Sequence, residues 1–149
     1  MDFDVNVRER ILKPVNEVFA AVIDPEKMSN YFISGASGPM QAGTTVVWEF
    51  ADVGAKVSID VLEVEENRKI VYESSALGPR TRTTIQFTPD GPDATVVTIN
   101  EASFPLTEDG VKRALGQNAG WTYTLCGLKA YVQFDINLRT GLNKRLTQV

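Results

Sequence analysis

Short stretches of alternating apolar and polar residues dominate the chain before residue 106. They lie at Phe3–Ile11, Val46–Phe50, Val57–Val61, Ile70–Ser75, Thr81–Phe87 and Val96–Ala102. Successive side chains of a strand point to opposite faces, so each stretch predicts a half-buried β-strand. Turn sequences such as Pro89–Pro92 join them, and Ser34–Gly43, with three glycines and a proline, is expected to be a loop. This spacing predicts an antiparallel meander of six strands.

Three other segments have apolar residues at helical spacing. Pro14 opens one short helix and Asp24-Pro25 opens another, because a first helical turn does not need the missing proline N–H. From about Thr107 to Leu138 the pattern predicts one long helix, capped by its first threonine and stopped near Gly141. At about 100° per residue, its core-facing stripe comprises Ala114, Trp121, Leu125, Leu128 and Val132. The order of elements predicts an α+β fold.

Length and charge narrow the class of protein. A chain of 149 residues can bury a core without metals or disulfides, so we expect a single domain over residues 1–149. The net charge is −4 and most basic residues are scattered, which argues against nucleic-acid binding. No N-terminal segment resembles a signal peptide, and no apolar run approaches the about 18 residues of a membrane span. We therefore expect a cytoplasmic protein.

The residues that are missing restrict the chemistry. The chain has no histidine and a single cysteine, Cys126, for which we expect an inert thiol. Histidine-based triads, histidine metal sites, cysteine zinc sites and internal disulfides are thereby excluded. No carboxylate pair has supporting spacing, and the glycines form no GxGxxG pattern. We expect no metal and no cofactor, and we single out no catalytic residue.

Three segments carry a resemblance to a known family. They are Pro14–Val22, Asp24–Phe32, and Gly120-Trp121 followed by Leu125, Leu128, Lys129 and Tyr131. In this order they resemble helices of the activator of Hsp90 ATPase homologue 1-like (AHSA1-like) family, part of the START/Bet v 1-like (SRPBCC) superfamily. That family usually ends its second helix in a tryptophan, where this chain has Tyr31 or Phe32. The resemblance implies a helix-grip fold, in which a curved sheet wraps around the long helix, with a cavity between them. It implies no particular reaction.

The implied cavity would be walled by strand faces and by one side of the long helix. Its expected lining comprises Trp48, Phe50, Ile59, Ile85, Phe87, Ile99, Glu101, Gln117, Asn118, Trp121 and Leu125. The two tryptophans pack in the core, line the cavity, or do both. Glu101 either reaches solvent at its strand end or anchors a ligand, and the amides of Gln117 and Asn118 have the same alternatives. Tyr31 and Phe32 either close the cavity mouth or pack internally.

The side of the long helix opposite Trp121 is poor in charge. It carries Ala119, Tyr123, Cys126, Ala130 and Phe134. Between Arg113 and Asp135, Lys129 is the only charged residue. Scattered exposed apolar residues are normal, whereas a contiguous stripe of small and aromatic residues is typical of a partner surface. Because two-fold homodimers are the commonest oligomers, we expect a homodimer through this stripe.

Three functions fit these patterns. The first, which we favour, is a non-enzymatic protein that holds a small apolar or amphipathic molecule. The second is a cyclase- or hydrolase-type enzyme that uses Glu101 or a tyrosine for acid–base chemistry, as a buried carboxylate facing an open cavity would indicate. The third is a protein-interaction module similar to the co-chaperone domain, which a filled core without a cavity would favour.

Overall fold

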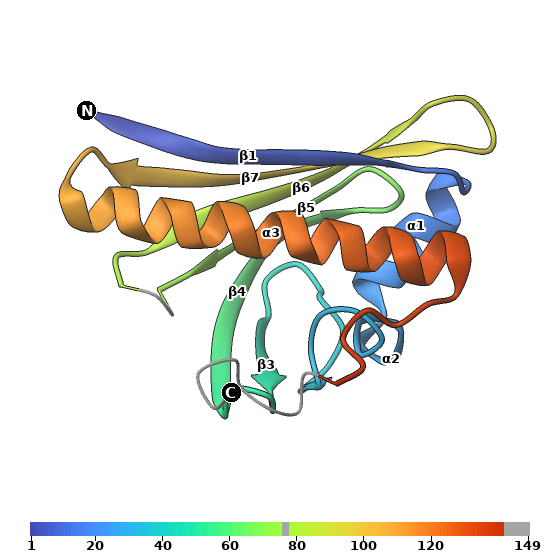
Figure 1. The fold of residues 1–149 in the computed structure, drawn as a ribbon, viewed down its shortest axis with the longest axis horizontal. Coiled ribbons are helices and arrows are strands. Elements are labelled where there is room, and N and C mark those ends of the chain that lie inside the picture. The colour runs from blue at the N-terminus through green and yellow to red at the C-terminus, as the bar shows by residue number, and fades with distance from the viewer. Residues whose placement is uncertain (76–77, 142–149) are drawn as a thin grey trace.

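Figure 1 shows the fold in a computed structural model that describes residues 1–75 and 78–141. The strands are β1 (Asp2–Ile11), β2 (Gly35–Ala36), β3 (Thr45–Phe50), β4 (Ala55–Glu65), β5 (Lys69–Ser74), β6 (Thr81–Pro89) and β7 (Thr95–Pro105). The helices are α1 (Val15–Ile23), α2 (Pro25–Met28) and α3 (Glu108–Phe134). The α+β class and the helix-grip arrangement predicted from the sequence are confirmed.

The strands form one antiparallel sheet, with α3 lying across one of its faces (Figure 1). The strand order is β1-β7-β6-β5-β4-β3-β2. Helix α3 packs mainly against β1 and β7, and among the described residues β3, β4 and β5 approach it much less. The pairing of β4 with β5 shifts register between Val61 and Glu63, and such a bulge bends a strand. The half of the sheet away from β1 therefore leaves space beneath the helix.

Two elements differ from the sequence prediction. The described residues form seven strands rather than six, because β2 adds two residues to the edge of β3 inside the segment expected to be a loop. A two-residue strand is too short to show alternation. The long helix ends at Phe134, not near Leu138 and Gly141. Asp135 adopts the left-handed conformation, with φ at 54°, and this terminates the helix.

Helix α3 begins in close contact with the end of β7. The Thr107 hydroxyl accepts a hydrogen bond from the backbone N–H of Gly110 (3.0 Å), which confirms the predicted cap. A Cβ atom added to Gly110 would lie only 1.9 Å from the carbonyl oxygen of Pro105. Glycine is thus required at this position, and its absent side chain lets the first helical turn rest directly on the strand end.

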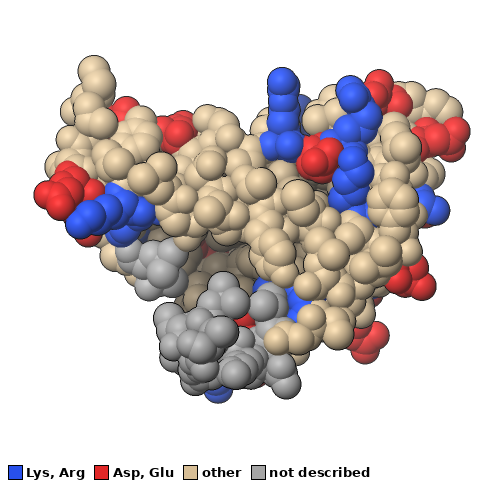
Figure 2. Space-filling model, viewed as in Figure 1, with Lys and Arg blue, Asp and Glu red and all other residues tan. Residues whose placement is uncertain are grey.

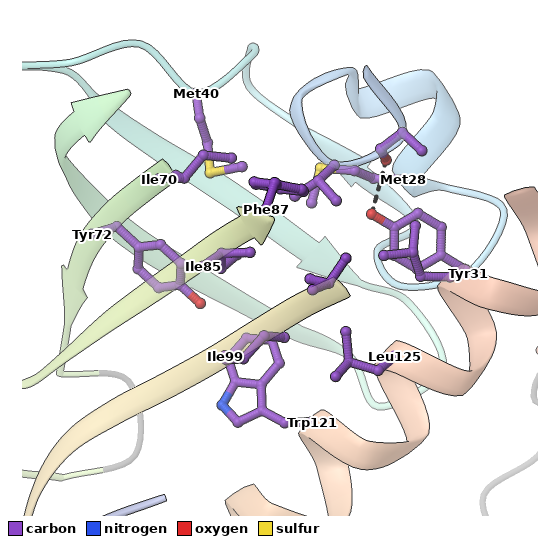
Figure 3. Close-up of a cluster of buried hydrophobic side chains, with 14 of the residues drawn as sticks. Met28, Tyr31, Met40, Ile70, Tyr72, Ile85, Phe87, Ile99, Trp121 and Leu125 are labelled. Carbon is purple, nitrogen blue, oxygen red and sulfur yellow. Dashed lines mark hydrogen bonds between the residues drawn. The ribbon is translucent and has the colours of Figure 1, made fainter. Parts of the chain in front are cut away.

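The predicted register of the long helix is confirmed. Trp121, Leu125 and Leu128 are buried against the sheet, whereas Phe134 is 58% exposed. Val132 is half-buried at the far end of the same stripe. Figure 3 shows Trp121 and Leu125 reaching from α3 toward the apolar side chains of the strands. The core therefore lies between the sheet and one narrow stripe of α3.

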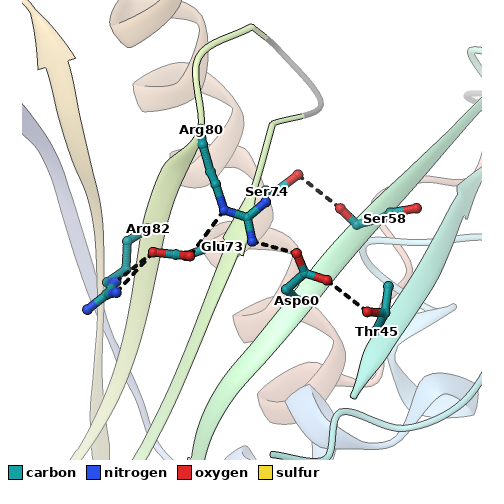
Figure 4. A network of polar contacts seen from close by, with 7 residues as sticks. All are labelled: Thr45, Ser58, Asp60, Glu73, Ser74, Arg80 and Arg82. Carbon is teal, nitrogen blue, oxygen red and sulfur yellow. Dashed lines mark hydrogen bonds and ion pairs between the residues drawn. The ribbon is translucent and has the colours of Figure 1, made fainter. Parts of the chain in front are cut away.

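An ion-pair network ties β4, β5 and the start of β6 together (Figure 4). Arg80 binds both Asp60 and Glu73, and Arg82 donates to the second carboxylate oxygen of Glu73 at 3.0 Å. Thr45 donates to Asp60 at 2.8 Å, which extends the network to β3. The side chain of Arg82 is 58% exposed, as the alternation along its strand predicts.

This network should make the stability of the fold depend on pH. Hydrogen bonds from Arg80 hold the pKa of Asp60 below its usual range, and those from Arg80 and Arg82 do the same for Glu73. Carboxyl groups with lowered pKa values stabilise the folded state above their unfolded pKa, and this contribution is lost as the pH falls through the folded pKa. The Arg80→Gln variant should therefore be less stable at neutral pH.

The difference in free energy of unfolding between the native protein and Arg80→Gln should shrink as the pH falls below about 4, where carboxyl groups of ordinary pKa become protonated. Denaturant titrations at several pH values measure this difference. Carboxyl-carbon NMR should also show a higher pKa for Asp60 in the variant. An unchanged Asp60 pKa would mean that Arg80 does not control this carboxyl group.

Candidate ligand-binding cavity

A cavity of about 380 Å³ opens between α3 and the inner face of the sheet. Strands β3 to β7 supply most of its wall, and α3 supplies the opposite side. Most of its wall is apolar, and its principal apolar residues are Phe32, Trp48, Phe50, Val57, Ile59 and Trp121. The cavity occupies the space between α3 and the half of the sheet away from β1, against which α3 does not pack closely.

Strand pairing brings the aromatic residues of the wall together. Trp48 lies opposite Val57 and Phe50 lies opposite Ala55, so these four side chains share one face of the β3–β4 pair. Phe32, which follows α2, packs its ring against Trp48, Phe50 and Trp121 with centroid distances of 5.3, 5.4 and 5.7 Å. Phe32 therefore connects the sheet side of the cavity to the helix side.

A row of polar side chains crosses the other part of the wall. Tyr72 of β5 lies opposite Thr83 of β6, and Thr83 lies opposite Glu101 of β7. Directly opposite residues of antiparallel strands share a face, so all three point toward α3. Thr81 and Ser74, which are also paired, lie two residues along the same face. The sheet thus gathers several polar groups at one end of an otherwise apolar cavity.

Glu101 lies at the centre of this polar end and is only 5% exposed, so the alternative that it reaches solvent is wrong. Its Oε1 atom accepts hydrogen bonds from the indole Nε1 of Trp121 (2.7 Å) and from the amide Nε2 of Gln117 (2.8 Å). Its Oε2 atom accepts one from the hydroxyl of Thr81 (2.7 Å). These three donors stabilise a carboxylate that would otherwise be costly to bury.

Tyr72 supplies a neutral hydroxyl to the same polar end. Burial raises the pKa of Tyr72 well above its usual range. A hydrogen bond with Thr83 opposes this effect and the negative charge of Glu101 adds to it. The phenol therefore stays protonated at physiological pH. Figure 3 shows Tyr72 and Trp121 reaching the interior from β5 and from α3.

The helix contributes to the cavity from the flank of its core stripe. Arg113, Gln117, Gly120 and Thr124 recur at helical spacing, and all four line the cavity. The Arg113 side chain is 15% exposed, donates from Nε to Asp109 (3.0 Å) and lies over the ring of Phe104, 5.5 Å from its centroid. A second, narrower stripe of α3 thus faces the cavity while the first packs in the core.

The segment after α3 returns to the rim of the cavity. Arg139 lines the cavity and forms an ion pair with Asp52 of the β3–β4 turn (2.9 Å). The hydroxyl of Tyr123, another lining residue, donates to the carbonyl oxygen of Leu138 (3.2 Å). These two interactions attach Leu138 to α3 and Arg139 to the β3–β4 turn.

Comparison with family models identifies this architecture. Residues 13–133 match the model of the family described as activator of Hsp90 ATPase homolog 1-like protein. The chain belongs to the AHSA1-like family. No curated protein sequence matches the chain. Within the described residues, no helix has the length and apolar character needed to cross a membrane, and no group of three or more His, Cys, Asp or Glu side chains is arranged to hold a metal ion.

Several solved protein structures have the same fold as this chain. The protein SSP2350 from Staphylococcus saprophyticus is 31% identical over 92% of this chain and 96% of its own, with a TM-score of 0.81. DynU16, from the dynemicin biosynthetic locus, is 26% identical with a TM-score of 0.81, and the match covers 92% of this chain and 49% of DynU16, so this chain spans about half of it. The Aha1 dimer from Colwellia psychrerythraea is 18% identical over 88% of this chain and 96% of its own, with a TM-score of 0.75.

In this AHSA1-like protein, several residues expected in the cavity lie elsewhere. Ile85, Ile99 and Leu125 surround a separate void of about 20 Å³ deeper in the core. Phe87 lines neither space and packs edge-on against Phe19 of α1, with ring centroids 5.1 Å apart. Asn118 is exposed and lies outside both linings, because it is one position beyond Gln117 and about 100° further around the helix.

Tyr31 also differs from its expected place at the cavity mouth. It is buried, stacks on Tyr131 with a centroid distance of 6.1 Å, and donates its hydroxyl proton to the carbonyl oxygen of Ala21 (2.8 Å). Burial raises the pKa of Tyr31, with Tyr131 adding to this effect, so the phenol remains a donor. Tyr31 thus packs α2 against α1 and α3, while Phe32 lines both the void and the cavity.

The expected lining included Gln117 and Trp121, two hydrogen-bond partners of Glu101, but it omitted Tyr72, Thr81, Thr83 and Arg139, which also line the cavity. Alternation along Ile70–Ser75 places Tyr72 on the same face as Ile70, so the strand pattern contained this signal. Thr81 and Thr83 share the face of Ile85 by the same rule. Arg139 had no such signal, because its position depends on how the segment after α3 folds back.

Proposed function

We propose that this protein binds a small, largely apolar molecule in the cavity of about 380 Å³. The observation that carries the proposal is the combination of an apolar, aromatic wall with a buried carboxylate at one end. Small-molecule sites typically have volumes of about 300–1,000 Å³, with mostly apolar walls and a few polar groups that orient the ligand. Trp48, Phe50, Ile59 and Trp121 would contact the apolar body of the ligand, and Glu101 with Gln117 would orient its polar end.

The cavity supports this function over a pure protein-interaction module, for which a filled core would suffice. DynU16, which has the same fold, is described as a putative protein in the dynemicin biosynthetic locus, and a role in biosynthesis is compatible with a ligand-binding cavity. A second candidate is an acid–base enzyme. It is favoured by one observation, namely that Glu101 and Tyr72 face the same open cavity.

Fluorescence can test the binding proposal directly. Trp48 and Trp121 are the only tryptophans of the chain and both line the cavity. Nile red, a neutral apolar dye, should bind, shift its emission to the blue and quench the tryptophan emission with saturable behaviour. An unchanged emission from both the dye and the tryptophans up to tens of micromolar dye would rule out an accessible apolar cavity in solution.

We also propose a homodimer through the outer stripe of α3, which comprises Ala119, Tyr123, Cys126, Ala130 and Phe134. Tyr123 and Phe134 are 40% and 58% exposed, and Cys126 is exposed. Figure 2 shows that the surface over the middle of α3 is largely uncharged. Tyr123 also borders the cavity and its hydroxyl is bound to Leu138, so only the exposed part of its ring is available to a partner. One helix face is smaller than the about 800 Å² per partner of a standard interface, so flanking residues must contribute.

The Phe134→Glu variant should weaken this dimer at least about tenfold, because a charge would be buried where an aromatic ring now lies. Its fold should be unaffected, since the Phe134 side chain lies outside the core. Leu62→Glu is the matched control and should leave association unchanged, because Leu62 is 42% exposed and lies on β4, a strand that among the described residues hardly contacts α3. Sedimentation velocity measures both. A native protein that is monomeric at tens of micromolar would contradict the dimer.

A further inference from the structure

The hydrogen bonds of Glu101 leave one acceptor position of its carboxylate unused. A carboxylate offers about four lone-pair sites, two on each oxygen. Oε1 uses both of its sites, for Trp121 and Gln117, whereas Oε2 accepts only from Thr81. Glu101 lines the cavity, so a ligand bound there would lie beside this carboxylate. The carboxylate is therefore held rigidly in place by protein donors but is one hydrogen bond short of its capacity.

Glu101 also lacks a cationic partner among the described residues. All three of its donors are neutral side chains, and it takes part in none of the ion pairs. The nearest candidate along the helix, Arg113, directs its Nε to Asp109 and places its guanidinium over Phe104. A buried carboxylate with only neutral partners keeps much of its negative potential, and in a cavity with apolar walls this potential acts on whatever enters.

We propose that the ligand presents a hydrogen-bond donor, either a hydroxyl or a protonated amine, to Oε2 of Glu101. This inference rests on the proposed binding function and adds the chemical class of the ligand. The apolar body of the ligand lies along Trp48, Phe50 and Trp121, and its donor end points toward β7. A ligand that ends in an ether loses the hydrogen bond, and one that ends in a carboxylate meets a like charge. The polar end of the cavity thus favours ligands that end in a hydrogen-bond donor over ligands that end in a carboxylate.

Four naphthalene derivatives of similar size test this selection. They are β-naphthol, β-naphthylmethylamine, the methyl ether of β-naphthol, and β-naphthoic acid. Calorimetric titration at neutral pH gives the dissociation constant of each. At least one of the two donor compounds should bind about tenfold or more tightly than the methyl ether, because a hydrogen bond to a charged acceptor is among the stronger ones. The acid should bind most weakly. Whichever donor binds more tightly identifies the ligand end as hydroxyl or ammonium.

The Glu101→Gln variant tests whether the carboxylate causes the preference. The amide keeps the size of the side chain and can still accept from Trp121, but it removes the charge and turns one acceptor into a donor. The ratio between donor compound and methyl ether should fall to less than about threefold, and the acid should bind better than it does to the native protein. A circular-dichroism melt verifies the fold. If the variant does not fold, the affinity ratio between donor compound and methyl ether in the native protein decides whether the inference holds.

The outcomes separate this inference from the binding proposal. Equal affinity for β-naphthol, the amine and the methyl ether overturns the donor rule while the cavity remains a binding site. Binding of Nile red without binding of any naphthalene compound also overturns it, since a donor-bearing apolar molecule of this size should be accepted. If neither the dye nor any naphthalene compound binds, the binding function itself fails and the inference fails with it. An unaltered preference in a folded Glu101→Gln variant would assign the selection to other residues.

Discussion

Replacing Gly110 with alanine should destabilise the fold by about 3 kcal/mol. The added Cβ would lie 1.9 Å from the carbonyl oxygen of Pro105, far inside van der Waals contact with rigid backbone. Relief requires the first turn of α3 to move away from β7. That movement breaks the hydrogen bond from the Gly110 N–H to Thr107, and a lost cap alone costs about 1 kcal/mol. Thermal unfolding should show the melting temperature lowered by roughly 6–12 °C for a chain of this size.

Gly116→Ala is the matched control for this prediction. Gly116 lies on the same helix, and a Cβ atom there would meet nothing within 4 Å. Alanine forms helices better than glycine by about 1 kcal/mol, so this variant should be slightly more stable than the native protein. The two substitutions therefore change stability in opposite directions although they are chemically identical. A Gly110→Ala protein as stable as the native one would show that the helix start is not held against the strand.

Much of this fold follows from periodicity along the chain. The six longer strands show the period of two, and the core stripe of α3 shows the period of 3.6, because each element buries one face. The cap of α3 was also predictable, since threonine before acidic residues marks a helix start. The helix end was not, because an aspartate in left-handed conformation is rarer there than glycine. Asp135 ends the helix, and Gly141 in the following segment does not.

In the candidate site, too, local periodicity could assign some residues and not others. Trp48, Glu101 and Trp121 could be assigned to the inner faces by local period, and the structure brings them to one cavity. The hydrogen bonds that join Glu101 to Gln117 and Thr81 depend on strand register and on the height of the helix over the sheet. No local pattern encodes those two quantities. The same limit explains why Asn118, adjacent to Gln117, could not be excluded from the lining.

The two stripes of α3 explain how one helix can close a core and also bound a cavity. The core stripe, with Trp121 and Leu125, packs toward β1 and β7, and the cavity stripe lies to one side of it over the bent half of the sheet. Small and polar residues such as Gly120 and Thr124 occupy this second stripe, where larger apolar side chains would fill the space. The cavity therefore stays open because these helix positions carry no large side chains.

Gly120→Leu should consequently abolish most of the binding of Nile red while preserving the fold. A Cβ atom at position 120 meets nothing within 4 Å, so the fold can accept the side chain, and its place between Gln117 and Thr124 on the cavity stripe directs it into the cavity. If the leucine displaces about 60 Å² of ligand contact at roughly 25 cal/mol per Å², the loss is about 1.5 kcal/mol. The dissociation constant of the dye should then rise about tenfold or more.

Gly116→Leu provides the control, since position 116 is equally open but does not line the cavity. Both leucines improve helix propensity by a similar amount, about 0.5–1 kcal/mol, so their melting temperatures should rise together. Only the variant at position 120 should lose affinity for the dye. Equal affinities in the two variants would place the binding site of the dye somewhere other than beneath α3. A loss of affinity confined to Gly120→Leu would locate that site in the space that the cavity stripe of α3 leaves open.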